Sequence, residues 1–242
     1  MRHKLLSLIL PFTLMVSLMA IPAKAGDGEW GFAVGVKAIT GDLDTSGSEL
    51  EDYGTLSQPA PEVNKTSVTE SVEVGAIFAE FAGRDGMLGF TSGVELIPGS
   101  ASLGTKTRTD TDADAGSESG TSYTYSAKAE VENVLTLYVE PTLYVSEGIG
   151  LYAKAGVTSL DLKTLETIAS GQASSTYPDK TMVGGILGGG IRYKHSSGLL
   201  VKLEHTETDF KTYNAQSTTG NLNRIQADID FTATSLSLGY QF

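Results

Sequence analysis

The chain has 242 residues and a formal net charge of −12, because 29 acidic residues outnumber 17 basic ones. This negative field argues against nucleic acid or an anionic lipid surface as an electrostatic partner. No apolar run of 18 residues follows residue 25, so membrane-spanning helices are excluded, whereas alternating barrel strands fit a mean hydropathy of −0.04.

The first 25 residues have the three regions of a secretory signal peptide. Arg2 and Lys4 precede an apolar run over 5–21, and an Ala-Lys-Ala site ends at Ala25. Cleavage there would leave 217 residues with a net charge of −15. The chain contains no cysteine, which excludes a lipoprotein anchor, and the signal peptide indicates export to the cell envelope.

Apolar residues alternate with small or polar ones in eight segments, which predicts eight β-strands. Four long polar connections, at about 41–66, 99–121, 161–180 and 209–223, alternate with three short turns. Long outer loops and short periplasmic turns are typical of a transmembrane barrel with both termini in the periplasm. The predicted strands cover about 30–43, 68–81, 88–96, 123–145, 151–158, 182–194, 199–206 and 235–242.

A lipocalin-like soluble barrel would carry its apolar faces inside instead of outside, and alternation alone does not separate the two. The glycine-rich faces are the charged ones, which indicates a polar interior, and aromatic residues gather near the short-turn ends of the apolar faces. In the second strand Val72, Val74, Ala76 and Phe78 are predicted to face lipid, with Glu80 at a rim. The predicted aromatic girdle contains Trp30, Phe32, Phe78, Phe90, Tyr193, Tyr240 and Phe242.

The predicted inner faces carry equal numbers of positive and negative side chains. An interior of eight strands is only wide enough for side chains to fill, so the favoured interpretation is a lumen plugged by ion pairs. A gated pore whose salt bridges switch partners is the functional alternative. The inner-face charges are Lys37, Lys128, Lys154, Arg192, Lys194 and Lys202 with Glu73, Glu95, Glu130, Glu132, Glu140 and Glu204.

Two other groups of residues carry little chemistry. The run from Asp110 to Asp114 has alternating carboxylates but lacks the glycine and glutamate of a calcium-binding EF-hand loop, so a solvated acidic loop is favoured. His195 in a predicted turn and His205 on a lipid-facing position lack the H-x-S-N pattern of lipid A deacylases. No catalytic residue, metal ligand or cofactor motif is therefore predicted.

The final residues, SLSLGYQF, place Leu236, Leu238, Tyr240 and Phe242 on one face. They resemble the C-terminal assembly signal of bacterial outer-membrane barrels. With EPTLYVSEGIGLYAKAGV and GGILGGGIRYKHSSGLLVKLEHTETDF, they make residues 26–242 similar to the opacity-type and OmpA-like group of outer-membrane proteins. The resemblance implies an all-β, eight-stranded, antiparallel up-and-down barrel that the barrel assembly machinery inserts.

The leading functional hypothesis is a non-enzymatic structural or surface-interaction protein of a Gram-negative outer membrane. Its acidic loops would meet an extracellular ligand or host surface, because polar loops on a rigid scaffold often carry recognition. The expected partners are outer-membrane lipid and lipopolysaccharide, and the expected state is a monomer without cofactors. The alternatives are a narrow channel for ions or small solutes and, more remotely, a lipid-modifying enzyme.

Overall fold

A computed structural model describes residues 30–51, 62–110, 123–168, 176–218 and 222–242. The predicted signal peptide lies outside these residues. In the described part there is no helix long and apolar enough to cross a membrane. The described residues form nine strands: β1 (Trp30–Glu51), β2 (Glu62–Asp85), β3 (Leu88–Asp110), β4 (Tyr123–Tyr144), β5 (Ile149–Ile168), β6 (Lys180–Lys194), β7 (Leu199–Phe210), β8 (Tyr213–Gln216) and β9 (Arg224–Gln241).

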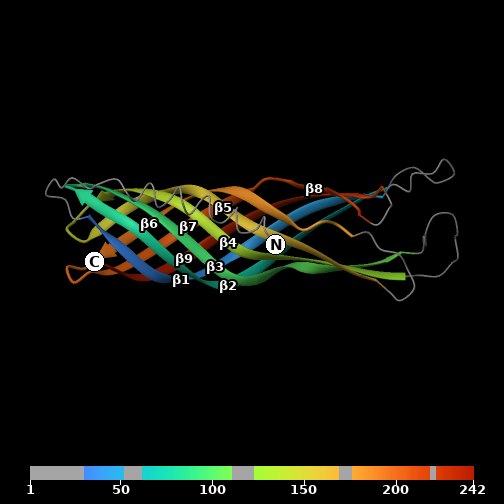
Figure 1. The fold of residues 1–242 in the computed structure, drawn as a ribbon, viewed down its shortest axis with the longest axis horizontal. Helices are drawn as coiled ribbons and strands as arrows, with labels where there is room; N and C mark the ends of the chain where they lie inside the picture. The colour runs from blue at the N-terminus through green and yellow to red at the C-terminus, as the bar shows by residue number, and fades with distance from the viewer. Residues whose placement is uncertain (1–29, 52–61, 111–122, 169–175, 219–221) are drawn as a thin grey trace, which may run out of the picture.

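The strands form one antiparallel sheet that closes on itself (Figure 1). Neighbours follow chain order from β1 to β7, β9 pairs with β7, and β1 pairs with β9. The short strand β8 adds to β9 beyond the end of β7 and lies outside the closed circuit. The predicted fold, a closed eight-stranded antiparallel barrel, is therefore confirmed.

One half of the barrel, here called the belt section, has an apolar outer surface. It comprises residues 30–39, 76–85, 88–97, 134–144, 149–159, 183–194, 199–206 and 234–242. Exposed Val36, Val157 and Leu187 represent its outer face, while Lys37, Thr158 and Arg192 point inward and are buried. About ten residues per strand is the length that a tilted strand needs to cross a hydrocarbon layer.

The other half, here called the extension, has the opposite pattern. It comprises the described residues on the side of the belt away from the short turns, namely 40–51, 62–75, 98–110, 123–133, 160–168, 176–182, 207–218 and 222–233. Its outward positions are polar, as at Asp44, Ser71 and Asp209. Its inward positions form an apolar core of Leu43, Leu103, Val131, Leu160, Leu162, Met182, Phe210, Tyr213 and Ile229.

The extension shortens the predicted loops. The loop expected at 41–66 is mostly strand, since β1 continues to Glu51 and β2 begins at Glu62, and the other three expected loops are shortened in the same way. Their polar residues occupy the outer face of regular strands whose inner face packs the apolar core.

The facing predicted for β2 is wrong. Phe78 and Glu80 are 5% and 1% exposed and point into the barrel, so Phe78 is not part of the aromatic girdle and Glu80 is not at a rim. The reason is local space: a Cβ on Gly35 would lie 2.4 Å from the Phe78 ring, so the absence of a side chain at Gly35 admits that ring. Glu73 consequently lies exposed on the outer face.

The uninterrupted alternation predicted for β4 is also wrong. Asn133 has a φ of 54°, and the pairing register with β5 shifts between Glu132 and Leu135. A bulge of this kind adds one residue to a strand, so the residues on its two sides follow opposite alternation. Relative to the belt part of β4, the residues that precede Asn133 are therefore reversed. Val131 therefore points into the core, and the predicted inner-face residues Lys128, Glu130 and Glu132 lie outside.

Strands β2 and β3 separate in the extension. Their ladder runs from the Asp85–Leu88 pair to the Ile77–Leu96 pair, with no further pairing among their described residues. β2 remains paired with β1, and β3 with β4, to the far ends of these strands. In Figure 1 the β3–β4 hairpin accordingly diverges from β1 and β2 at the right.

Candidate functional site in the barrel interior

The belt section contains a buried ion cluster, whose first half surrounds Lys202. The Lys202 ammonium donates to Glu80 Oε1 at 2.5 Å and to both Glu140 oxygens at 2.8 Å. Tyr138 donates to the same Glu80 oxygen at 2.7 Å. All three charged side chains are at most 2% exposed, so each depends on the others for the stabilisation that water would supply.

The second half contains two lysines that share two glutamates. Lys37 and Lys154 donate to Glu204 Oε1 at 2.9 and 3.0 Å, and both also reach Glu95 Oε2. Tyr152 donates to the other Glu204 oxygen at 3.1 Å. Four strands thus contribute one charged group each to a compact square of alternating charge.

Aromatic rings join the halves of the cluster. The Lys154 ammonium lies 4.0 Å from the centre of the Tyr138 ring, and Lys202 lies 5.0 Å from that of Tyr152. These rings need space that glycine provides: a Cβ on Gly93 would lie 2.4 Å from Tyr138. Glycines on the inner face therefore leave room for large inward side chains, which fill the lumen at the level of the ion cluster.

Arg192 completes the charge balance. Its guanidinium donates to Thr91 Oγ1 at 2.5 Å, and its side chain is buried. The buried charges of the described belt section are then Lys37, Lys154, Arg192 and Lys202 against Glu80, Glu95, Glu140 and Glu204, four of each sign. A balanced, hydrogen-bonded cluster is the arrangement in which buried charges are least costly.

The structure brings seven of the twelve predicted inner-face charges together: Lys37, Glu95, Glu140, Lys154, Arg192, Lys202 and Glu204. The other five are not part of this cluster: Glu73, Lys128, Glu130 and Glu132 lie on the outer face, and Lys194 is half-buried near the short-turn end. Sequence reasoning missed Glu80. Its position inside an otherwise apolar segment was the available signal, because a carboxylate in the belt section has a favourable place only in the lumen.

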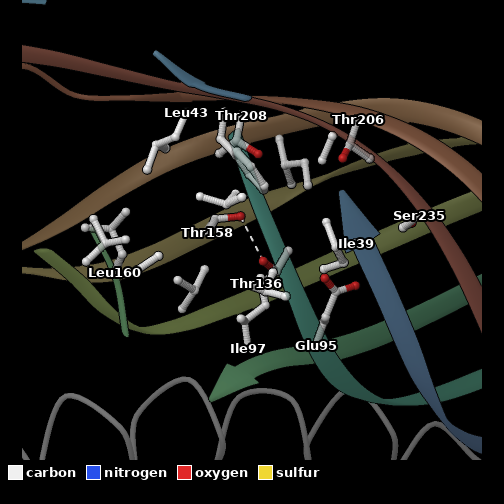
Figure 2. Close-up of a pocket in the computed structure, with 18 of the residues that line it drawn as sticks. Ile39, Leu43, Glu95, Ile97, Thr136, Thr158, Leu160, Thr206, Thr208 and Ser235 are labelled. Atoms are coloured by element: carbon white, nitrogen blue, oxygen red, sulfur yellow. Dashed lines mark hydrogen bonds between the residues drawn. The ribbon is translucent and has the colours of Figure 1, made fainter. Parts of the chain in front are cut away.

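A cavity of about 70 Å³ lies between the ion cluster and the apolar core of the extension (Figure 2). Glu95 lies at one end, and Leu43 and Leu160 lie at the other. Lys37 and Glu204, which are joined to Glu95 in the ion cluster, also line the cavity. Between the two ends the hydroxyls of Thr136 and Thr158 are hydrogen bonded at 2.9 Å. The remaining lining side chains are mostly aliphatic or aromatic, so the cavity is apolar with a polar floor.

The outer face of the extension carries acidic residues on three adjacent strands. The pairing registers place Asp209 of β7 beside Asp230 of β9, and Asp230 beside Asp44 of β1. Partial burial, followed by the charges of Asp209, Asp228, Asp44 and Glu207, raises the pKa of Asp230 above its usual range. This face of the extension is therefore strongly negative.

The remaining sequence candidates lie apart. His195 is in the turn after β6, with Nδ1 2.8 Å from Ser197 Oγ, and His205 is exposed on β7 with Nδ1 3.0 Å from Thr234 Oγ1. Among the described residues no three His, Cys, Asp or Glu side chains form a group able to hold a metal ion. Residues 111–114 of the acidic run lie outside the described part of the chain.

The residues of the predicted assembly signal form the outer face of β9 and the residue after it. Leu236, Leu238, Tyr240 and Phe242 are all exposed in the belt section, and the Tyr240 and Phe242 rings lie 5.7 Å apart. The backbone N–H of Phe242 donates to the Phe32 carbonyl at 2.8 Å, so the end of the chain joins the seam between the first and last strands.

Several solved outer-membrane proteins are similar to this chain. The crystal structure of the outer membrane protein OprG from Pseudomonas aeruginosa is similar with a TM-score of 0.52 and 14% identity, covering 88% of this chain and 96% of OprG. Ail of Yersinia pestis, solved with the heparin analogue sucrose octasulfate, has a TM-score of 0.36 and 9% identity, covering 86% of this chain and 99% of Ail.

Neisserial surface protein A has a TM-score of 0.33 and 9% identity, covering 90% of this chain and all of that protein. No curated protein sequence matches the chain. Residues 12–242 match the family described as outer membrane protein beta-barrel domain. The closed eight-stranded barrel, the apolar belt and the charged interior agree with this match, and the chain belongs to that family of outer-membrane barrel proteins.

Proposed function

We propose that this protein is a non-enzymatic barrel of a Gram-negative outer membrane whose lumen is sealed and whose extension projects outside the cell. The ion cluster of the belt section carries the first part of this proposal. Its side chains are buried and pair across the lumen, from β1 to β3 and β7 and from β7 to β2 and β4. An ion crossing the barrel would have to separate these buried pairs, which is energetically costly.

Planar bilayer recording tests the seal. Purified, refolded protein is expected to give no stable single-channel steps across the usual range of voltage. A triple variant, Lys37→Ala with Lys154→Ala and Lys202→Ala, removes three cations from the cluster and is expected to be leakier if it folds. Regular conductance steps from the unaltered protein would instead support the alternative of a narrow channel.

The proposed role is surface interaction through the extension. At about 3.3 Å per residue, the twelve residues 40–51 of β1 add on the order of 40 Å of tilted strand beyond the belt section. The apolar core makes this part a firm platform, and its β7–β9–β1 face presents Asp44, Asp209 and Asp230. Such a surface favours a positively charged partner and repels polyanions.

A binding assay on whole cells tests this role. Cells displaying the protein are expected to bind poly-lysine beads, and the variant Asp44→Asn with Asp209→Asn and Asp230→Asn is expected to bind less. The matched control neutralises three acids on the outer face of β4 and β5: Glu130→Gln, Glu132→Gln and Asp161→Asn. Equal loss in both variants would show a nonspecific charge effect and count against the proposed face.

We also propose that the last strand directs assembly. Phe242 is exposed on the outer face, so its contribution to packing within the barrel is small. Phe242→Ala is expected to lower the amount of barrel in the outer membrane while leaving in vitro refolding in detergent nearly unchanged. Equal loss in both measurements would assign Phe242 a purely structural role, and no loss in cells would exclude an assembly role.

A further inference from the structure

The separation of β2 from β3 interrupts the hydrogen-bonded wall of the barrel. It starts directly after the Ile77–Leu96 pair. Pro98 has no backbone N–H to donate and Gly99 has a φ of 95°, so β3 bends away where the pairing ends. Farther along, a Cβ on Gly104 would lie 2.8 Å from the Glu70 carboxylate and 2.9 Å from the Val68 side chain, so side chains of β2 reach β3 there. The stretch without backbone pairing is therefore bounded at both ends, and it is called the window below.

The window lies beside the cavity. Val72 and Val74 on the β2 edge and Ile97 and Ala101 on the β3 edge all line the cavity. Val72, Val74, Ile97 and Ala101 are each only partly buried. The cavity wall and the window thus share their side chains, and a molecule in the window would contact the cavity lining.

The height of the window indicates where such a molecule would come from. Unpaired strand edges are not tolerated in hydrocarbon, and the ladders of the belt section are closed all round. The window therefore begins at the upper boundary of the apolar belt, at the level of lipid headgroups. Small amphipathic molecules concentrate at this level, with an apolar part in the lipid and a polar group toward water.

The lining indicates the chemistry of the occupant. Ile39, Val134, Ile186 and Phe231 offer only apolar contact, whereas the floor offers hydroxyl, ammonium and carboxylate groups. The floor charges are already paired, so an additional ionised group would be buried without compensation. A hydroxyl can both donate and accept there at little cost.

We propose that this cavity binds a small neutral molecule with an apolar body and one hydroxyl group, which reaches it through the window between β2 and β3. The volume of about 70 Å³ would hold on the order of five water molecules, so the body is short, comparable to a chain of about five or six carbons. The acidic face of the extension plays no part in this binding.

Photolabelling with a six-carbon alcohol that carries a diazirine tests the site, using the full barrel in lipid nanodiscs. Mass spectrometry is expected to find label on Val74, Ile97 and Val131, and excess 1-hexanol should abolish it. Ala101→Phe fills the cavity and should reduce this label about tenfold, the equivalent of 1.4 kcal/mol. Ala153→Phe places the same side chain on the outer belt and should leave the label unchanged.

The set of residues labelled on the unaltered protein tests the proposed binding site even if Ala101→Phe fails to fold. Label confined to lipid-facing residues such as Leu96 and Leu187, or label that 1-hexanol does not compete away, would overturn the proposal. The route is tested by joining Glu73→Cys to Ser100→Cys, on the two edges of the window, with a short bismaleimide. The bridged protein should label severalfold more slowly, and an unchanged rate would overturn access through the window.

Discussion

The belt section and the extension are built by the same strands, yet they reverse each other's pattern. In the belt section Val157 and Leu187 face outward while Lys154 and Arg192 are buried inside. In the extension Leu160 and Phe210 are buried inside while Asp209 faces outward. Because the inward positions remain on the same parity along β5 and β7, the reversal is one of composition, and it reflects the solvent outside each half.

The comparison shows how one barrel can satisfy two solvents. Because hydrocarbon surrounds the belt, polar side chains are favourable only in the lumen, where opposite charges must neutralise one another. Water around the extension permits the usual arrangement, with apolar side chains inside. The cavity lies at the boundary, where the lumen changes from ion pairs to apolar packing.

Removing Lys202 should have the largest effect on stability. Lys202→Met leaves the buried carboxylates of Glu80 and Glu140 without their cation, and the expected loss is about 3–5 kcal/mol of unfolding free energy. Urea unfolding of the barrel in lipid vesicles measures it. Adding Glu80→Gln and Glu140→Gln to the same variant should restore much of the loss, whereas no recovery would mean that packing alone was lost.

One substitution made in both halves should separate them. Leu160→Ala opens a hole in the apolar core of the extension and should cost about 2–5 kcal/mol. Leu238→Ala on the outer belt exchanges lipid contacts only and should cost about 1 kcal/mol or less. Unfolding in vesicles compares them directly, and equal losses would contradict the assignment of inner and outer faces.

Asn133 allows a smaller effect to be tested at the boundary itself. The positive φ of this residue suits asparagine and glycine but not a β-branched side chain. Asn133→Gly should leave stability nearly unchanged, while Asn133→Val should cost about 1–2 kcal/mol. If valine were tolerated as well as glycine, the bulge that reverses β4 would not depend on this conformation.

Particular residues show how far the sequence could predict this arrangement. Period-two alternation was sufficient to place Val36, Lys37 and Lys154 on their correct faces. It failed in β2, because both faces are apolar there and only the charge of Glu80 distinguishes them. It also failed for residues 124–132, which precede Asn133, since a bulge is a conformational event that residue polarity does not encode.

The sequence did not predict the extension, for a different reason. Its outer residues, such as Asp42 and Asp44, have the composition of a loop, and the inward Leu43 between them is a weak signal by itself. Only the pairing across strands shows that Leu43 packs with Val131 and Ile229 in one core. The cavity and the window depend on contacts between residues that are far apart in the sequence, so the sequence alone could not predict them.

The acidic face of the extension should show the smallest effect, and one that depends on pH. The raised pKa of Asp230 means that the folded barrel binds its proton more tightly than the unfolded chain does. The carboxyl therefore costs nothing below the unfolded pKa of about 3.9, and its destabilisation grows as the pH rises through the folded pKa. Asp230→Asn should then stabilise the barrel slightly at pH 7 and not at pH 3, as followed by thermal unfolding.

Depth measurements with spin labels test the reversal of the two halves most directly. The chain has no cysteine, so single cysteines at Val36, Val157 and Leu187 of the belt and at Asp44, Ser71 and Lys163 of the extension can each carry a nitroxide in vesicles. The belt labels should collide with oxygen and be shielded from a water-soluble nickel complex, and the extension labels should show the opposite preference. Similar accessibility at both sets of positions would contradict a barrel that crosses the membrane with one half and stands in water with the other.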